Sequence, residues 1–136
     1  DSEDIYVMSE RLDAVLNGAK DTVREAEVMG MEPDEAVAAM ATLLADGARQ
    51  LATAFERLDP DRRGKAGASA TEAADAAVKS QRQLERVYRQ AASALLGVDD
   101  LREVMGRREL YRRLSRVSEI LIEAADRVWY ATVKEG

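Results

Sequence analysis

The stretch that decides the fold is the last third of the chain, residues 101–134, which reads LREVMGRRELYRRLSRVSEILIEAADRVWYATVK. Apolar residues recur in it at three- and four-residue steps, helix-forming residues fill the positions between them, and it contains no proline. This periodicity predicts one continuous α-helix, which would be ~50 Å long at 1.5 Å per residue. Only other long helices can cover an element of that length, so the stretch predicts a helical bundle.

Two adjacent apolar stripes run along this expected helix. The first consists of Leu110, Leu114, Val117, Leu121 and Val128, and the second of Tyr111, Ile122, Ala125, Trp129 and Thr132. Two hydroxyl side chains, Ser115 and Ser118, fall within the second stripe. A face this broad indicates burial against helices on two sides.

Three more amphipathic segments precede this one, and we expect helices at about residues 3–29, 33–58, 69–96 and 100–134. Gly30 is placed to end the first helix and Pro33 to begin the second. Ser69 and Glu72 have the spacing of a capping box for the third, so residues 59–68 are expected to form the one real loop. Short links make successive helices antiparallel neighbours. The expected fold is all-α: a single domain, built as an up-and-down bundle of four long antiparallel helices.

The composition limits the chemistry that the chain can perform. Its 136 residues include no cysteine and no histidine, which excludes disulfides, thiolate chemistry and the commonest general base. A metal site would have to be built from oxygen ligands, which favours hard ions or oxo-bridged iron. The sequence has no glycine-rich phosphate loop and no nucleophile with a plausible base beside it, so we expect no enzymatic activity.

The charge is acidic and unevenly distributed. The net charge is −6, with 14 acids and 5 bases in residues 1–60 and an excess of bases in the remainder. An acidic total argues against general binding to nucleic acid. No apolar run approaches the length of a membrane span, and no signal peptide is visible.

Three parts of the chain carry a resemblance to a known family. They are residues 1–6 (DSEDIY) with 11–17 (RLDAVLN), residues 81–89 (QRQLERVYR), and residues 109–134, which begin ELYRRL and end in valine and lysine. In this order they resemble the third, fifth and final helices of the PhoU-like family of phosphate-transport regulators, in its branch of short stand-alone proteins. The resemblance covers nearly the whole chain.

The resemblance implies a PhoU-like bundle and a role as a non-enzymatic regulator of inorganic phosphate transport. Such a protein would be cytoplasmic, would lie near the inner face of the membrane, and would contact a phosphate transporter or a signalling protein. Family members have two further helices at the start, which this chain does not match. If those helices are absent, the first two helices here would expose an apolar face, and a partner or a second copy should cover it. We therefore also expect a homo-oligomer.

The resemblance also implies candidate metal ligands. The family repeats a carboxylate, three residues and an aspartate, and this spacing puts both oxygens on one helix face, where several helices can share an iron cluster. The matching positions are Asp13 with Asn17, Gln81 with Glu85, and Ser115 with Glu119. Each pair keeps one acid. The candidate ligands are thus Asp13, Glu85 and Glu119, with weak oxygen donors from Asn17, Gln81 and Ser115.

Two interpretations of these pairs stay open. Lone carboxylates on helices are usually surface residues, which favours Gln81 and Ser115 as parts of a bundle contact and Glu85 and Glu119 as solvent-facing acids. The alternative is a reduced site for iron or another divalent metal, which requires acids from two or more helices to converge. The simplest interpretation is that the fold is kept, the metal chemistry is lost and no cofactor is bound.

Basic residues concentrate on the third and fourth helices. They are Lys79, Arg82, Arg86, Arg89, Arg107, Arg108, Arg112, Arg113 and Arg116. One interpretation is a patch for an acidic partner, a phosphate-bearing ligand or an anionic membrane surface. The favoured alternative is a solvated face paired with nearby acids, as Glu109, four residues before Arg113, would allow.

The expected function is therefore regulation of phosphate transport through protein–protein contact. Two alternatives belong to other classes. One is a structural helical bundle whose role is oligomerisation, and the other is a carboxylate metal-cluster protein with a storage or redox role.

Overall fold

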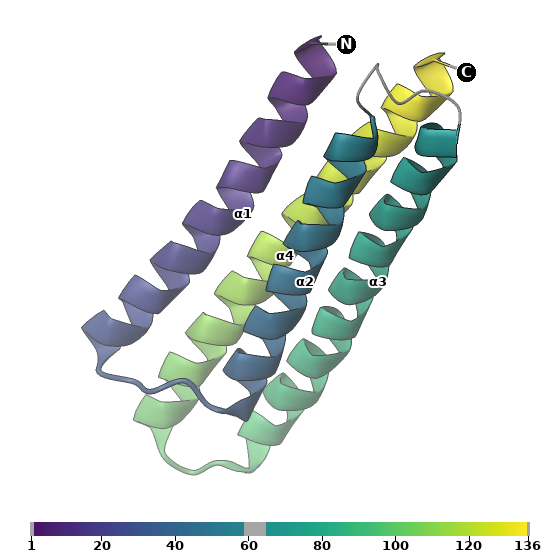
Figure 1. Ribbon diagram of the computed structural model, residues 1–136. Coiled ribbons are helices and arrows are strands. Elements are labelled where there is room, and N and C mark those ends of the chain that lie inside the picture. The colour runs from purple at the N-terminus through teal and green to yellow at the C-terminus, as the bar shows by residue number, and fades with distance from the viewer. Residues whose placement is uncertain (1, 59–64, 136) are drawn as a thin grey trace.

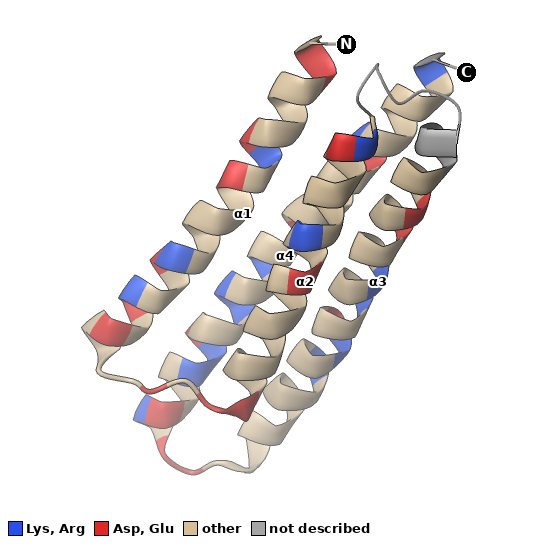
Figure 2. Ribbon diagram, in the orientation of Figure 1, with Lys and Arg blue, Asp and Glu red and all other residues tan. Residues whose placement is uncertain are grey.

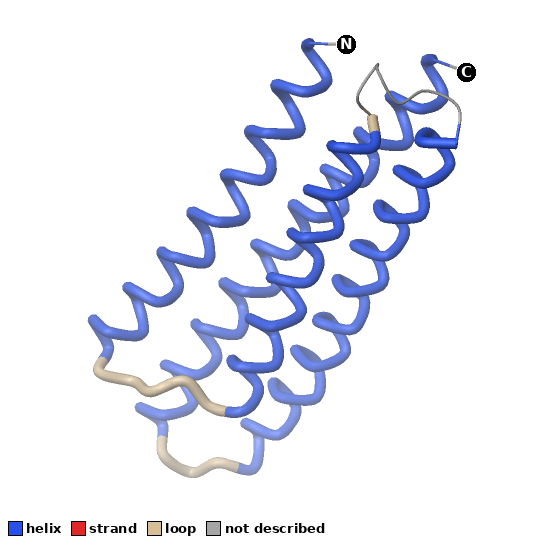
Figure 3. The backbone as a smooth tube through the Cα atoms, in the orientation of Figure 1, coloured by secondary structure: helices blue, strands red, loops and turns tan. Residues whose placement is uncertain are grey.

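The computed structural model describes residues 2–58 and 65–135, and throughout these ranges the chain is built from helices (Figure 1). They are α1 (Ser2–Met29), α2 (Glu35–Arg57), α3 (Lys65–Ala94) and α4 (Leu101–Glu135), with a short 3-10 turn, η2 (Leu95–Gly97), before the last. Figure 3 shows that the α1–α2 and α3–α4 links lie at the same end of the bundle. The predicted all-α, up-and-down bundle of four antiparallel helices is confirmed.

The core is organised around α4, which packs against α1, α2 and α3. Leu110, Leu121 and Val128 of its first stripe are fully buried, and in its second stripe Ala125 is fully buried and Tyr111 nearly so. The first stripe alone reaches two neighbours, since Val117 meets Gly18 of α1 and Leu121 meets Gly47 of α2. Burial on two sides, as the breadth of the face predicts, is confirmed.

Two glycines bring α4 close to its neighbours. A Cβ atom at Gly47 of α2 would lie 2.6 Å from Cδ1 of Leu121, and one at Gly18 of α1 would lie 2.5 Å from Cγ2 of Val117. Real Cβ atoms do not approach other carbons so closely, so each contact depends on a glycine, which has no side chain. Gly47 therefore brings α2 close to α4, and Gly18 brings α1 close to α4.

The turn after α1 ends the helix as predicted, whereas α2 begins later than predicted. Gly30 has a φ of 62°, and the Met31 N–H donates to the Ala26 carbonyl at 2.9 Å, which is the pattern of a glycine C-terminal cap. The expected start of α2 at Pro33 is wrong by two residues. Asp34 is the N-cap, because its side chain accepts a hydrogen bond from the Val37 N–H at 2.9 Å, and the helix follows from it.

The third helix begins earlier than the expected capping box. α3 starts at Lys65, so Ser69 is inside the helix and does not cap it. Lys65, Ala66 and Ala68 are good helix formers, and they allow a further turn ahead of Ser69 in spite of Gly67. Residues 59–64 of the expected loop lie outside the described residues.

The first two helices are antiparallel, as predicted, but they hardly touch. α1 packs mainly on α4, and Figure 1 shows α1 standing apart from α2 along most of its length. The close contact at Gly18 ties α1 to α4. The space that remains beside α2 is the groove described below.

In residues 2–58 and 65–135, none of the helices is both long and apolar enough to cross a membrane.

Candidate functional site

Four polar side chains lie in the contact between α3 and α4, and we call them the polar seam: Gln81, Glu85, Ser115 and Ser118. Gln81 donates from Nε2 to the Ser118 hydroxyl at 3.3 Å, and Ser118 donates to the Ser115 carbonyl at 2.6 Å. The Ser115 hydroxyl in turn donates to the Glu85 carboxylate. Gln81 is 8 % exposed and Ser118 is fully buried.

Two hydrogen bonds of the polar seam join α3 to α4, and the third lies within α4. The hydroxyl protons of both serines are donated to acceptors within it, as is an amide proton of Gln81. A buried network that is satisfied in this way fixes one register of two helices, because any slip would leave polar atoms unpaired in the core. The seam therefore acts as a structural device that aligns α3 with α4.

The structure brings only part of the predicted metal set together. Glu85 is half-buried and meets Ser115 across the α3–α4 contact. Asp13, Asn17 and Glu119 lie on exposed positions of their helices, and α1 has no substantial contact with α3.

Within residues 2–58 and 65–135, no three acidic side chains are grouped so that they could hold a metal ion. Metal binding by Asp13, Glu85 and Glu119 stays a prediction from the sequence.

An ion-pair cluster that the sequence did not reveal joins the start of α1 to the end of α4. Asp4 is 2 % exposed, and its Oδ1 accepts from Nε and Nη2 of Arg127, both at 2.9 Å. Lys134 Nζ lies 3.7 Å from the other carboxylate oxygen, and Arg127 stacks over the Tyr130 ring at 5.2 Å. Asp4 precedes the buried Met8 by four residues, so it occupies a core-facing position. That spacing is the signal that could have identified it.

A second cluster holds the α1–α2 link against α4. The Tyr111 hydroxyl donates to the Asp34 carboxylate, and Arg107 lies 3.6 Å from the same carboxylate and donates to the Glu32 carbonyl. Burial is the main cause that raises the pKa of Tyr111 well above its usual range. The hydrogen bond to Asp34 and the negative charge of Asp34 raise this pKa further. Asp34 thus has two roles, as the N-cap of α2 and as the anchor of this link.

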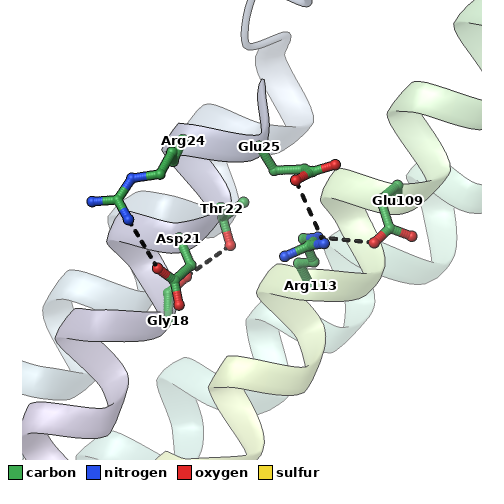
Figure 4. A network of polar contacts seen from close by, with 7 residues as sticks. All are labelled: Gly18, Asp21, Thr22, Arg24, Glu25, Glu109 and Arg113. Carbon is green, nitrogen blue, oxygen red and sulfur yellow. Dashed lines mark hydrogen bonds and ion pairs between the residues drawn. The ribbon is translucent and has the colours of Figure 1, made fainter. Parts of the chain in front are cut away.

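Charged side chains also connect α1 with α4 beside the groove (Figure 4). Arg113 lies 2.8 Å from Glu109 on its own helix and 3.7 Å from Glu25 on α1. On the exposed side of α1, Arg24 lies 4.0 Å from Asp21. The pairing of Glu109 with Arg113 that the sequence predicts is confirmed.

Most of the other basic residues on α3 and α4, unlike Arg113, are not paired with any described acid. Figure 2 shows lysine and arginine along both of these helices. Among the described residues, seven of the nine bases that the sequence analysis names on them form no ion pair, namely Lys79, Arg82, Arg86, Arg89, Arg108, Arg112 and Arg116. The expectation that the face is paired with nearby acids is wrong for these seven, because the bases of α3 and α4 outnumber the acids of the same two helices.

An apolar groove with a volume of about 650 Å³ lies between α1 and α2. We call it the α1–α2 groove. Leu16 and Val23 on its α1 edge are 51 % and 60 % exposed. Its α1 wall includes Leu16, Ala19 and Val23, its α2 wall Ala41, Ala45 and Ala48, and its floor Leu44, Leu110 and Leu114. The apolar face that the sequence predicts on the first two helices is present.

Two acids are the only charged side chains among the described residues that line the groove. Glu27 ends its α1 wall and Glu32 lies in the α1–α2 link, so both mark the same end. Both are exposed, and neither forms an ion pair with any described residue. The groove is therefore apolar along its length and negative at one end.

No family model, curated protein or solved structure matches this chain.

Proposed function

We propose that this chain is a non-enzymatic accessory protein that regulates inorganic phosphate transport through protein–protein contact. The observation that supports contact as its mode of action is the α1–α2 groove, an apolar surface that no described residue covers. Contiguous exposed apolar surface of this kind marks sites where another molecule binds.

The energetics of the groove support the same proposal. Leu16 and Val23 are about half exposed, and burying the rest of each would contribute about 1 kcal/mol. A bundle whose only requirement is to fold could close α1 onto α2 and bury both. The close contact at Gly18 places α1 against α4, and Leu16 and Val23 stay exposed to a partner.

The proposal that the regulated process is phosphate transport rests on the sequence. The resemblance of residues 81–89 and 109–134 to the PhoU-like regulators supports a phosphate transporter or an associated signalling protein as the partner. The polar seam supports a role without catalysis, because its serines and Gln81 are hydrogen-bonded between helices.

The test is affinity purification of the tagged chain from the cells that produce it, together with phosphate uptake in a deletion strain. We expect a phosphate transporter or its signalling partner to co-purify and phosphate uptake to change on deletion. Val23→Asp, in the groove, should abolish co-purification, and Leu101→Asp should not. Leu101 is the matched control because it is 70 % exposed and does not line the groove. Unchanged uptake and no transporter among the captured proteins would refute the proposed process.

A second candidate is a structural bundle that oligomerises. The same groove favours it, since a second copy could bury Leu16 and Val23. Analytical ultracentrifugation of the purified chain distinguishes the two: a dimer that Val23→Asp dissociates supports this candidate, and a monomer at all concentrations excludes it.

A further inference from the structure

We infer that the α1–α2 groove receives an amphipathic helix of a partner protein, with the basic end of that helix over Glu27 and Glu32. The inference rests on the proposed function and adds the chemistry and orientation of the partner. It is drawn from the length of the groove, the residues of its walls, and the charge at its end.

The length of the groove matches a helix. Its α1 wall runs from Val15 to Gly30, which at 1.5 Å per residue is ~22 Å. A partner helix that follows this wall would have about 15 residues, or four turns. An irregular segment would fit less well, because its backbone N–H and C=O groups would be left unpaired against apolar walls.

The walls of the groove have the pattern of small and large side chains that helix packing requires. The α2 wall is made of Ala41, Ala45 and Ala48, which recur at four- and three-residue steps. Such a row of small side chains lets the backbone of another helix approach closely. On the opposite wall Leu16 and Val23 are one heptad apart, so they lie on one stripe of α1 and can insert between successive turns of the partner. The partner should present large aliphatic residues at the same three- and four-residue spacing.

The charge at the end of the groove sets the chemistry and the direction of the partner. Glu27 and Glu32 are exposed there without an ion-pair partner among the described residues. Arg107 is nearby, but it is bound to Asp34 and to the Glu32 carbonyl. Lysine or arginine at one terminus of the partner would complement the two carboxylates, which favours a single orientation.

The same charges argue against a second copy as the occupant. α1 carries seven acids and three bases in Ser2–Met29. Two of the bases are engaged, because Arg11 lies 3.7 Å from Glu123 and Arg24 lies 4.0 Å from Asp21. Packing the α1–α2 face of one copy against that of another would therefore bring two acidic surfaces together. Like charges across an interface oppose association.

The experiment titrates the purified chain with two fluorescent helical peptides of about 15 residues. Both carry the same leucine stripe; one has lysines and the other glutamates in the last turn, and anisotropy reports binding. We expect the lysine peptide to bind ~10-fold more tightly, since the two exposed carboxylates attract one peptide and repel the other. The double variant Glu27→Lys/Glu32→Lys should reverse this preference. Non-specific binding to an apolar surface would not show such a reversal.

Two further variants locate the binding. Val23→Asp should abolish binding of the lysine peptide, and Leu101→Asp should leave it unchanged. Both residues are exposed, so the variants should fold, and circular dichroism checks that they do. Equal binding of the two peptides, or binding that survives Val23→Asp, would overturn the inference. So would a dimer of the chain alone that Val23→Asp dissociates while neither peptide binds, because a second copy would then be the occupant.

This test is independent of the process named in the proposed function. Peptide binding with the predicted charge preference supports the inference even where no transporter co-purifies. Co-purification of a transporter that Val23→Asp does not affect would refute the groove as the docking site and keep the proposed function.

Discussion

Replacing Ser118 by alanine tests whether the polar seam holds α3 and α4 in register. The substitution removes the acceptor of Gln81, whose Nε2 then has no partner in a site where the glutamine is 8 % exposed and Ser118 fully buried. Leaving a buried donor unpaired costs about 1–3 kcal/mol, and alanine returns about 0.5 kcal/mol through its higher helix propensity. We therefore expect Ser118→Ala to destabilise the protein by about 1–2 kcal/mol.

The reciprocal substitution should behave differently. Gln81→Leu leaves the Ser118 hydroxyl bonded to the Ser115 carbonyl at 2.6 Å and adds apolar surface to the core, so its effect should be within about 0.5 kcal/mol. With both changes present no donor is orphaned, and the double variant should recover about 1 kcal/mol relative to the sum of the single variants.

Urea denaturation followed by circular dichroism gives all three free energies of unfolding. A Ser118→Ala variant as stable as the wild type would refute the reasoning. A coupling energy near zero between Ser118 and Gln81 would do the same, since the hydrogen bond would then contribute nothing to the α3–α4 contact.

Further predictions concern packing, pH and metal. Gly47→Ala should destabilise the protein by about 1 kcal/mol, because the strain of overpacking the buried Leu121 exceeds the gain in helix propensity; chemical denaturation measures this, and a stabilised variant would contradict it. Tyr111→Phe should cost about 1–2 kcal/mol near neutral pH through loss of the hydrogen bond to Asp34. Because burial and Asp34 raise the Tyr111 pKa, the folded state keeps this proton above about pH 10 whereas the unfolded state loses it, so stability falls as the pH rises. The phenylalanine variant should show a shallower fall between neutral pH and pH 11, and parallel curves would disprove the linkage. Elemental analysis should find no stoichiometric iron or zinc, and a metal content that Glu85→Gln abolishes would establish the metal-cluster alternative.

The fold could be predicted from sequence because its strongest signals are local. The two stripes of α4, such as Leu121 beside Ile122, specify a broad buried face whatever the arrangement of the other helices. The start of α2 was missed by two residues because both Pro33 and Asp34 favour a helix start, and only the hydrogen bond from Val37 to Asp34 decides between them. Helix ends are in general less well determined by sequence than helix centres.

The polar clusters depend on contacts between distant residues, and the sequence predicts them only partly. Gln81 stands out in an apolar stripe, and the structure supplies its partner on α4, Ser118. Asp4 was missed because an acid in the first turn is already explained by the helix dipole, which conceals its burial against Arg127. The extent of the α1–α2 groove depends on how far α1 leans away from α2, and no local pattern encodes that distance.

Site-specific photocrosslinking in the cells that produce this chain tests the groove as its contact surface most directly. A photoreactive phenylalanine analogue is placed at Leu16 or Val23, both on the edge of the groove, and at Leu101 as the exposed control outside it. We predict that both groove positions crosslink to one partner protein, through a basic amphipathic helix, and that the control position does not. Crosslinks that form equally from Leu101, or that join only two copies of this chain, would contradict the prediction.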